Sequence, residues 1–436
     1  MLINLTHILQ MDLVMFQKML IKVRDKSVQS EQEPQSFVEK LHRLRRDIPP
    51  SEIKELILDS EKYYLDNPDV KESGMCAVGH FFDYGEKEGR TFHIPQLRHK
   101  KTYTAEKNHK KIIYSTLPAN SGTNLYRAIF PGENDKNCIF NHAGSTLEET
   151  LESIFTADEV IFIRPNYDPL TVFLMTLCRK TGVTVTLDID DLMLPEFVAS
   201  QGAVRSNDID AGWLEKILIG DSSLLLLADK IVCSTPLLVE IYKKSHSNVS
   251  LRRNKLPKRF FSENQKNKKE KNGPLKILYL SGTKTHVMDF SIISGVMMRL
   301  AQTRDDFEMT FLGKTGNYAN TLKAAGASVQ QIDIVSFAEM MTIISHHDVV
   351  LVPLEDTVFN NAKSNIKFIE AAACGVPIIA SPVSEFSQFI KHGVNGWICH
   401  STDEWYNCIA SLAHDRDAAI NAGLAAHHTS LTELSL

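Results

Sequence analysis

One segment near the carboxyl end of the chain carries residue types that bind phosphorylated ligands. Lys363, Ser364, Asn365, Ile366 and Lys367 follow an apolar run and begin a stretch with helical periodicity. The first N–H groups of a helix lack partners within the helix, and its dipole places about half a positive charge at that end. Because two lysines beside such a terminus suit a diphosphate group, we expect this segment to hold one.

A carboxylate stands one helical turn after the second of these lysines. Glu370 would reach ribose hydroxyls if a diphosphate lay at the start of the helix. Apolar runs at 349–352 and 376–380 flank the segment and predict buried strands, with Gly375 ending the helix. Ligands of open α/β sheets bind at the carboxyl ends of strands. The segment therefore predicts a site for a nucleotide diphosphate.

A second polar turn directly follows the apolar run that begins at Lys276. Gly282 would let the backbone approach a phosphate, and Thr283, Lys284 and His286 supply hydrogen-bond donors. The glycine spacing of the dinucleotide fingerprint is absent. The alternative is a tight strand-to-helix turn capped by the threonine. We favour donor binding because the position and the chemistry agree.

Acidic residues gather at the end of the predicted strand at 183–187. Asp188, Asp190 and Asp191 repel one another, which raises the pKa of at least one carboxyl and suits a general base or a metal ligand. The alternative is a helix cap accompanied by solvated acids. Arg164 follows another predicted strand, where its charge could neutralise a leaving diphosphate.

Composition excludes several classes of protein. The chain has 436 residues, is 43% apolar and carries a formal net charge of −5, so we expect two or three packed domains and no nucleic-acid partner. Its seven cysteines include no C-x-x-C pair, a pattern typical of free thiols in a reducing compartment. The histidines show no metal-ligand spacing with cysteine, so we expect no metal site.

Hydropathy favours a cytoplasmic protein. No apolar run reaches the roughly 20 residues that a transmembrane helix needs. Residues 1–23 are apolar at helical spacing but lack a basic region and a cleavage site, so they do not resemble a signal peptide. This amino-terminal helix suits peripheral contact with the inner face of a membrane and a protein partner equally well.

Alternating strand and helix patterns predict an α/β fold with two Rossmann-like, doubly wound domains facing a cleft, preceded by a small helical region. In residues 51–97, we expect clustered aromatic side chains to form a miniature core rather than a carbohydrate platform. The tail shows no obvious packed helix. The expected parts are a helical, partly flexible segment at 1–50, a small helical module at 51–97, a basic linker at 98–110, a first α/β domain at 111–257, a polar linker at 258–274, a second α/β domain at 275–414 and a tail at 415–436.

The residues at 360–370 and the Ala-Cys-Gly-Val-Pro stretch at 373–377 also carry a family resemblance. They resemble the donor site of GT-B glycosyltransferases of the family 4-like type, called glycosyl transferases group 1. The usual pattern has another glutamate eight positions before Glu370, where this chain has Ala362. The chain is more similar to a branch with an Asn-Asn-Ala-Lys-Ser-Asn stretch, in which that first glutamate is absent.

The resemblance implies a glycosyltransferase that uses a UDP- or GDP-linked sugar and transfers it, with retention, to a glycan, lipid-linked or protein acceptor. It implies no cofactor and no dedicated metal, and a setting in bacterial polysaccharide biosynthesis or protein glycosylation. It places Asp190 and Asp191 near the acceptor and Lys367 at the leaving diphosphate. Gly122, Arg164, Arg252 and Asn254 would line the cleft, with surface charge the alternative for Arg252. The main rival is a degenerate GT-B subunit that serves another glycosyltransferase as a scaffold, which Ala362 would support.

Overall fold

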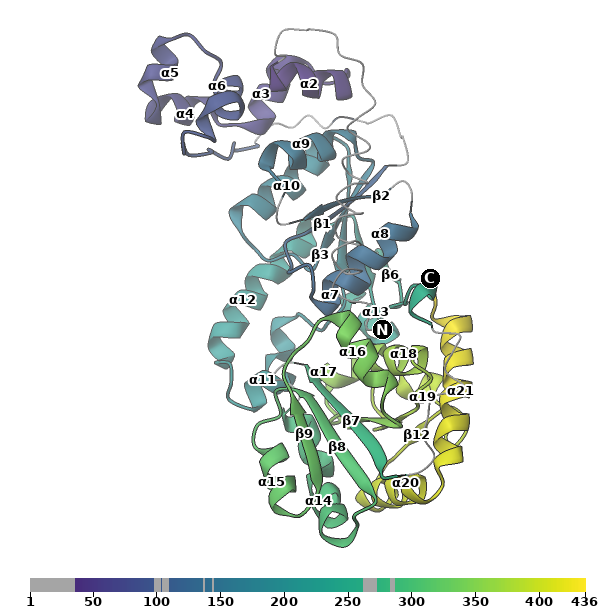
Figure 1. Cartoon of the computed structure of the whole chain (residues 1–436). Coiled ribbons are helices and arrows are strands. Elements are labelled where there is room, and N and C mark those ends of the chain that lie inside the picture. Colours follow the sequence, from purple (N-terminus) through teal and green to yellow (C-terminus); the bar gives the residue numbers. More distant parts are fainter. Residues whose placement is uncertain are drawn as a thin grey trace, which may run out of the picture.

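The computed structural model describes residues 36–97, 103, 110–135, 138–142, 145–261, 273–282 and 287–436. The expected helix at 1–23, most of both linkers, and Thr283, Lys284 and His286 lie outside these residues. Figure 1 shows a small helical module at one end, one sheet with its helices in the middle, and a second sheet with its helices at the other end. Among the described helices, none combines the length and the apolar composition needed to cross a bilayer.

The first sheet has six parallel strands in the order β2-β1-β3-β4-β5-β6. Chain order reverses between β1 and β3, which makes the gap beyond their carboxyl ends the expected ligand position. The strands are β1 (Lys111–Ser115), β2 (Cys138–His142), β3 (Glu159–Ile163), β4 (Thr184–Ile189), β5 (Lys230–Cys233) and β6 (Val249–Leu251). Its helical segments are α7 (Gly122–Asn124), η2 (Leu125–Ile129), α8 (Phe130–Asn134), α9 (Leu147–Thr156), α10 (Pro169–Lys180), η3 (Pro195–Ser200), α11 (Gly202–Arg205), α12 (Ala211–Ser223), η4 (Leu224–Leu227) and α13 (Pro236–Tyr242).

The second sheet is also parallel, in the order β12-β11-β10-β7-β8-β9, and reverses between β7 and β10. Every residue of β10 is buried, as expected for an apolar strand with helices on both faces. The strands are β7 (Leu275–Gly282), β8 (Phe307–Gly313), β9 (Ser328–Ile332), β10 (Val349–Val352), β11 (Ile378–Ala380) and β12 (Trp397–Ile398). The helices are α14 (Val287–Thr303), α15 (Tyr318–Ala324), α16 (Phe337–Ser345), α17 (Val358–Asn361), α18 (Ile366–Ala373), α19 (Phe386–Phe389), α20 (Thr402–His414) and α21 (Arg416–Glu433). A short 3-10 turn, η5 (Lys258–Phe260), follows the first domain.

The amino-terminal helices pack directly on the first α/β domain. The rings of Phe92 and Phe173 lie 6.1 Å apart, and Arg45 donates to the carbonyl of Thr181 at 2.7 Å. The expected aromatic core is present in part: Tyr63, Phe81 and Phe82 are buried and Tyr64 is half-buried, whereas Tyr84 is 51% exposed. The helical segments are α2 (Phe37–Leu44), α3 (Pro50–Ile57), α4 (Ser60–Asp66), α5 (Pro68–Glu72), α6 (Ala77–His80) and η1 (Phe81–Gly85).

The structure corrects the expectation for residues 415–436. Instead of a tail without a packed helix, most of them form α21, which runs along the outside of the second domain and packs against α18 (Figure 1). A side chain at Gly423 would overlap the carbonyl oxygen of Gly375, so only glycine allows this close approach. Beyond α21, Leu256 and Leu434 are joined by a backbone hydrogen bond of 3.0 Å, which ties this end of the chain to the segment between the domains.

Candidate functional site

The strand order brings the expected ligand-binding loops together. Gly122 follows β1 and Arg164 follows β3, the two strands at the reversal point of the first sheet. Gly282 ends β7, and Lys363 lies in the loop after β10, the two strands at the reversal point of the second sheet. Each of these four segments, predicted from residue chemistry, thus follows a strand at the reversal point of its sheet. The reversal point is where a doubly wound sheet binds its ligand.

The start of α18 has unsatisfied polar groups. Asn365 occupies the N-cap position, but its side chain does not cap the helix. The residue is 1% exposed, and neither polar atom of its side chain has a hydrogen-bond partner among the described residues. Buried amides normally have partners because an unsatisfied polar group costs about 1–3 kcal/mol. Together with the amides of Ile366 and Lys367, which open the helix, this arrangement suits a polar ligand.

Lys367 is held in a poorly solvated position beside that helix start. Burial lowers the pKa of its ammonium group to about 8, with the charge of Asp289 opposing the shift. Its Nζ lies 5.8 Å from the centre of the Tyr279 ring. Near neutral pH the side chain is thus a half-buried cation, and a diphosphate would compensate its charge.

Glu370 lies one turn further along α18, at the contact between the two domains. Tyr126 of η2 donates its hydroxyl to Oε1 of Glu370 at 3.2 Å. Burial raises the pKa of the Glu370 carboxyl to about 7, and the Tyr126 hydrogen bond and the charge of Lys367 oppose the shift. The carboxyl is therefore close to half-protonated at neutral pH and can donate or accept a hydrogen bond.

The three neighbouring aspartates have different roles in the structure. Asp188 is 1% exposed, and both of its oxygens accept hydrogen bonds from Arg127, at 2.6 and 3.0 Å. Arg252 donates to the same carboxylate at 2.7 Å. Asp188 is therefore paired with arginines inside the domain and does not share in the expected repulsion, whereas the charge of Asp190 does contribute to a raised pKa of Asp191.

Asp190 and Asp191 lie among the cations of both domains. Arg164 approaches Asp190 at 3.4 Å and has a backbone φ of 37°, a strained conformation of the kind that clusters at functional sites. Burial raises the pKa of Asp191, and the charges of Lys363 and Arg164 partly offset that effect. The acidic pair of the first domain and the lysine loop of the second are thus electrostatically coupled.

Arg252 and Asn254 bind buried groups of the first domain, and Asn254 also binds the second domain. Arg252 donates to the carbonyl of Arg127 as well as to Asp188, both at 2.7 Å. Asn254 accepts from Arg127 at 3.0 Å and donates to the hydroxyl of Ser364 at 2.8 Å, which links the two domains. Sequence reasoning missed Arg127, which is fully buried, because it lies within the otherwise apolar run Leu125–Phe130.

The loop before α18 contacts the first domain at several points. Thr235 donates its hydroxyl to the carbonyl of Ala362 at 2.9 Å. The Ala362 side chain is fully buried in the hydrophobic core of the first domain. The position at which the family usually has its first glutamate is therefore a packing contact in this chain. Arg205 of α11 makes a two-pronged ion pair with Glu355 at 2.6 and 2.9 Å. These contacts hold the two reversal points together.

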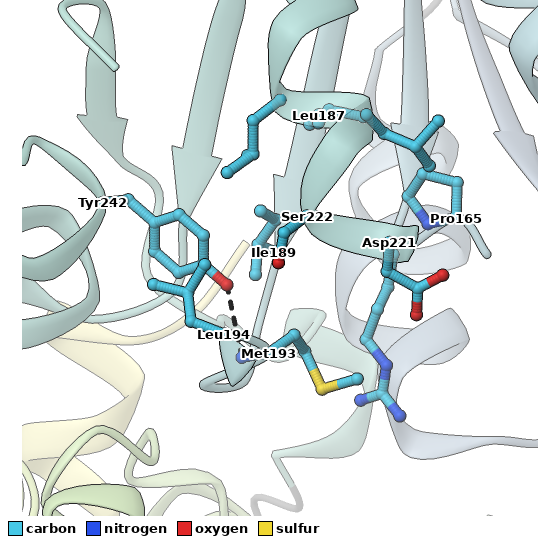
Figure 2. Close-up of a pocket in the computed structure, with 11 residues that line it drawn as sticks. Pro165, Leu187, Ile189, Met193, Leu194, Asp221, Ser222 and Tyr242 are labelled. Atoms are coloured by element: carbon cyan, nitrogen blue, oxygen red, sulfur yellow. Dashed lines mark hydrogen bonds between the residues drawn. The ribbon is translucent and has the colours of Figure 1, made fainter. Parts of the chain in front are cut away.

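A small cavity lies beside Arg164 in the first domain (Figure 2). Its volume is about 30 Å³, enough for one or two water molecules. Figure 2 shows Pro165 and Asp221 on one side and Tyr242 on the other, with the Tyr242 hydroxyl bonded to the amide of Met193 at 3.2 Å. Among the residues that the structure describes, no group of three or more His, Cys, Asp or Glu side chains is placed to hold a metal.

Comparison with known sequences identifies the second domain. Residues 276–415 match the family model described as glycosyl transferases group 1. A D-inositol 3-phosphate glycosyltransferase from Pseudarthrobacter chlorophenolicus is 26% identical over 142 residues, which is 30% of this chain and 33% of that protein. The chain thus spans about a third of the length of this curated relative.

Solved structures with the same architecture align with most of this chain and with nearly all of their own length. HepE from Anabaena, crystallised with UDP, has 13% identity and a TM-score of 0.52, covering 75% of this chain and 96% of its own. A sucrose-phosphate synthase from Thermosynechococcus elongatus has 13% identity and a TM-score of 0.52, covering 75% and 95%. A glycosyltransferase from Rickettsia africae has 14% identity and a TM-score of 0.51, covering 76% and 95%.

The chain therefore has the GT-B fold, and its second domain matches the model of glycosyl transferases group 1. The expected family resemblance and the expected pair of Rossmann-like domains after a helical region are both confirmed.

Proposed function

We propose that this protein is a glycosyltransferase that transfers a sugar from a nucleotide-diphosphate donor to an acceptor. The observation that carries the proposal is the start of α18, where the unpartnered Asn365 amide, the desolvated Lys367 and the buried Glu370 lie at the reversal point of a parallel sheet. The match of this domain to glycosyl transferases group 1 supports it.

The donor is a UDP- or GDP-linked sugar, and UDP is the first to test. Two similar structures, of HepE, are complexes with UDP and with UDP-glucose. The diphosphate would lie at the start of α18 with Lys367, near Lys363, Ser364 and the turn beyond Gly282. Glu370 would bind the ribose hydroxyls. In this proposal the protein needs neither a cofactor nor a dedicated metal, because helix amides and lysines supply the positive charge.

Catalysis would rest on charge stabilisation and orientation. As the bond from sugar to diphosphate breaks, negative charge grows on the departing phosphate, where Lys367 and the helix amides would stabilise it. Asp190 and Asp191, with Arg164, would orient the acceptor on the opposite side. The reaction would proceed with retention, on a glycan, lipid-linked or protein acceptor of a bacterial polysaccharide or protein-glycosylation pathway.

Nucleotide release from sugar donors tests the proposal. The purified chain is incubated with UDP-glucose, UDP-N-acetylglucosamine or GDP-mannose, and free nucleotide diphosphate is measured by a coupled assay without acceptor and with mixed oligosaccharides. We expect turnover of one donor, reduced about 100-fold or more in Lys367→Ala, on the scale of a lost oxyanion donor. Lys391→Ala removes an exposed lysine of the same domain and should leave the rate unchanged.

The alternative, a degenerate GT-B subunit with a scaffold role, predicts a different result. Folded protein that releases no nucleotide from any of these donors, with or without oligosaccharides, would contradict the transferase proposal and favour that alternative.

A further inference from the structure

Two exposed aromatic side chains belong to the first domain, one in the loop after β3 and one on α12. Tyr167 lies in the loop after β3, three residues beyond Arg164, and is 55% exposed. Trp213 lies in the first turn of α12 and is 57% exposed. Large aromatic side chains are usually buried, and an exposed group of them often marks a binding surface. Neither residue has a role in the donor site described above.

The structure fixes Tyr167 against α12. Its backbone N–H donates to Asp221 at 2.6 Å. A Cβ built on Gly220 would lie 3.3–3.4 Å from the Cβ, Cγ and Cδ1 atoms of Tyr167, so the ring base rests on the bare backbone of the helix. A side chain held in this way loses little conformational entropy when a ligand packs on it.

Trp213 lies on the same face of the helix as this contact. It precedes Gly220 by seven residues, which is two helical turns and about 10 Å along the axis. Half-buried Ile217 lies between them on that face. Tyr167 and this face of α12 thus form one surface, which we call the aromatic strip and define as Tyr167, Ile217 and Trp213.

The surroundings of the strip favour a sugar chain as its occupant. Asp221, which anchors Tyr167, lines the small cavity (Figure 2). Arg164 lines the same cavity and approaches Asp190. Sugar rings have an apolar C–H face, which packs on aromatic rings, and rim hydroxyls, which bind carboxylates and guanidinium groups. A strip of aromatic rings that leads to such polar groups matches both parts of a carbohydrate.

We propose that the aromatic strip is an extended acceptor subsite that holds a glycan chain while its terminal sugar reaches Asp190 and Arg164. The proposal rests on the proposed glycosyltransferase function and names its acceptor class as an oligosaccharide or polysaccharide. A small alcohol or a free monosaccharide would not need a surface that spans two turns of α12, about 10 Å along the helix axis.

Glycan binding tests the proposal with matched variants. The full chain, with UDP present, is applied to a microarray of bacterial and eukaryotic glycans, and the strongest soluble oligosaccharide is then titrated into each variant by calorimetry. In the unmodified chain and in Tyr167→Ala, tryptophan emission gives a second readout from Trp213, because Trp397 and Trp405 are only 9% and 2% exposed. We expect Tyr167→Ala and Trp213→Ala to weaken binding at least 10-fold, and Trp213→Phe to restore most of it. Ile219→Ala changes a 55% exposed residue on another face of α12 and should bind like the unmodified chain.

Three outcomes would overturn the proposal. They are the absence of glycan binding by the unmodified chain, glycan binding that both alanine variants retain, and self-association that both variants abolish, which would assign the strip to a second copy of the chain.

UDP affinity separates this proposal from the proposed function. Normal UDP binding together with any of these outcomes removes the subsite alone, whereas loss of UDP binding by the unmodified chain contradicts the donor site itself.

Discussion

At the residue scale, two ionisable groups one turn apart on α18 are both shifted toward neutrality by burial. The pKa of Lys367 falls to about 8 and that of Glu370 rises to about 7. Each group gives up part of its charge when no ligand compensates it, which is the behaviour expected where a charged ligand completes the site. Perturbed groups of this kind reduce the stability of the folded chain in exchange for function.

Replacing Glu370 with glutamine tests whether this buried carboxyl lowers the stability of the folded chain. The pKa of Glu370 is higher in the folded chain than the usual 4.5, so its contribution to stability is complete below about pH 4.5 and is lost as pH rises to about 7. Glutamine can still accept from Tyr126 but does not ionise. We expect Glu370→Gln to raise the free energy of unfolding by up to roughly 3 kcal/mol at pH 8 and by little at pH 5, measured by urea denaturation.

Glu215→Gln, an exposed position on α12, is the control and should change little at either pH. A glutamine variant at position 370 that is less stable than the unmodified chain at pH 8 would show that the ionised carboxylate is stabilising.

At the element scale, strands were predictable where apolar runs were continuous. The runs at 349–352 and 376–380 correspond to β10 and β11, but β2, β6 and β12 were missed because they are short or contain polar residues. Helix α21 was missed because its buried face is made of small side chains, among them Ala419, Ala422 and Gly423, which give little contrast with the exposed face.

The candidate site was predictable to a similar extent. Lysines and a glutamate beside a strand end are local signals, and strand order then brings them together. The role of Arg127 was not predictable, because its partners Asp188 and Asn254 are 61 and 127 residues away in the chain. Contacts of this kind depend on the tertiary fold and leave no local pattern.

The close packing of α21 on the turn after α18 gives a test at this scale. Gly423→Ala would force apart the helix and the carbonyl of Gly375, and we expect a loss of about 1–3 kcal/mol in the free energy of unfolding, as for other overpacked sites. Gly295→Ala on α14 meets nothing within 4 Å and should stabilise the chain by up to about 1 kcal/mol. Equal effects of the two substitutions on the urea midpoint would contradict the packing described for α21.

At the scale of the whole molecule, the two domains are joined near the site by specific polar contacts. Tyr126 reaches Glu370, Asn254 reaches Ser364, and Arg205 reaches Glu355. All three contacts lie close to the reversal points of the sheets, so ligand binding and domain contact use neighbouring residues. Any change in the angle between the domains would therefore change the donor site.

The Arg205–Glu355 pair offers a measure of that contact. In a double-mutant cycle with Arg205→Ala and Glu355→Ala, we expect a coupling energy of about 0.5–1 kcal/mol in the free energy of unfolding, reduced by 1 M salt, because the pair is partly exposed but two-pronged. A coupling energy of zero at low salt would mean that the pair does not hold the domains together in solution.

Titration calorimetry with UDP tests whether the start of α18 binds a nucleotide diphosphate through Lys367. At pH 7 we expect saturable binding by the unmodified chain and by Lys391→Ala. Affinity should fall between pH 7 and 9, because the free lysine loses its proton near pH 8, whereas Lys367→Ala should bind weakly at both pH values. Two results would contradict this assignment. One is a folded chain that binds none of UDP, GDP and ADP, and the other is a Lys367→Ala variant that binds UDP as tightly as the unmodified chain.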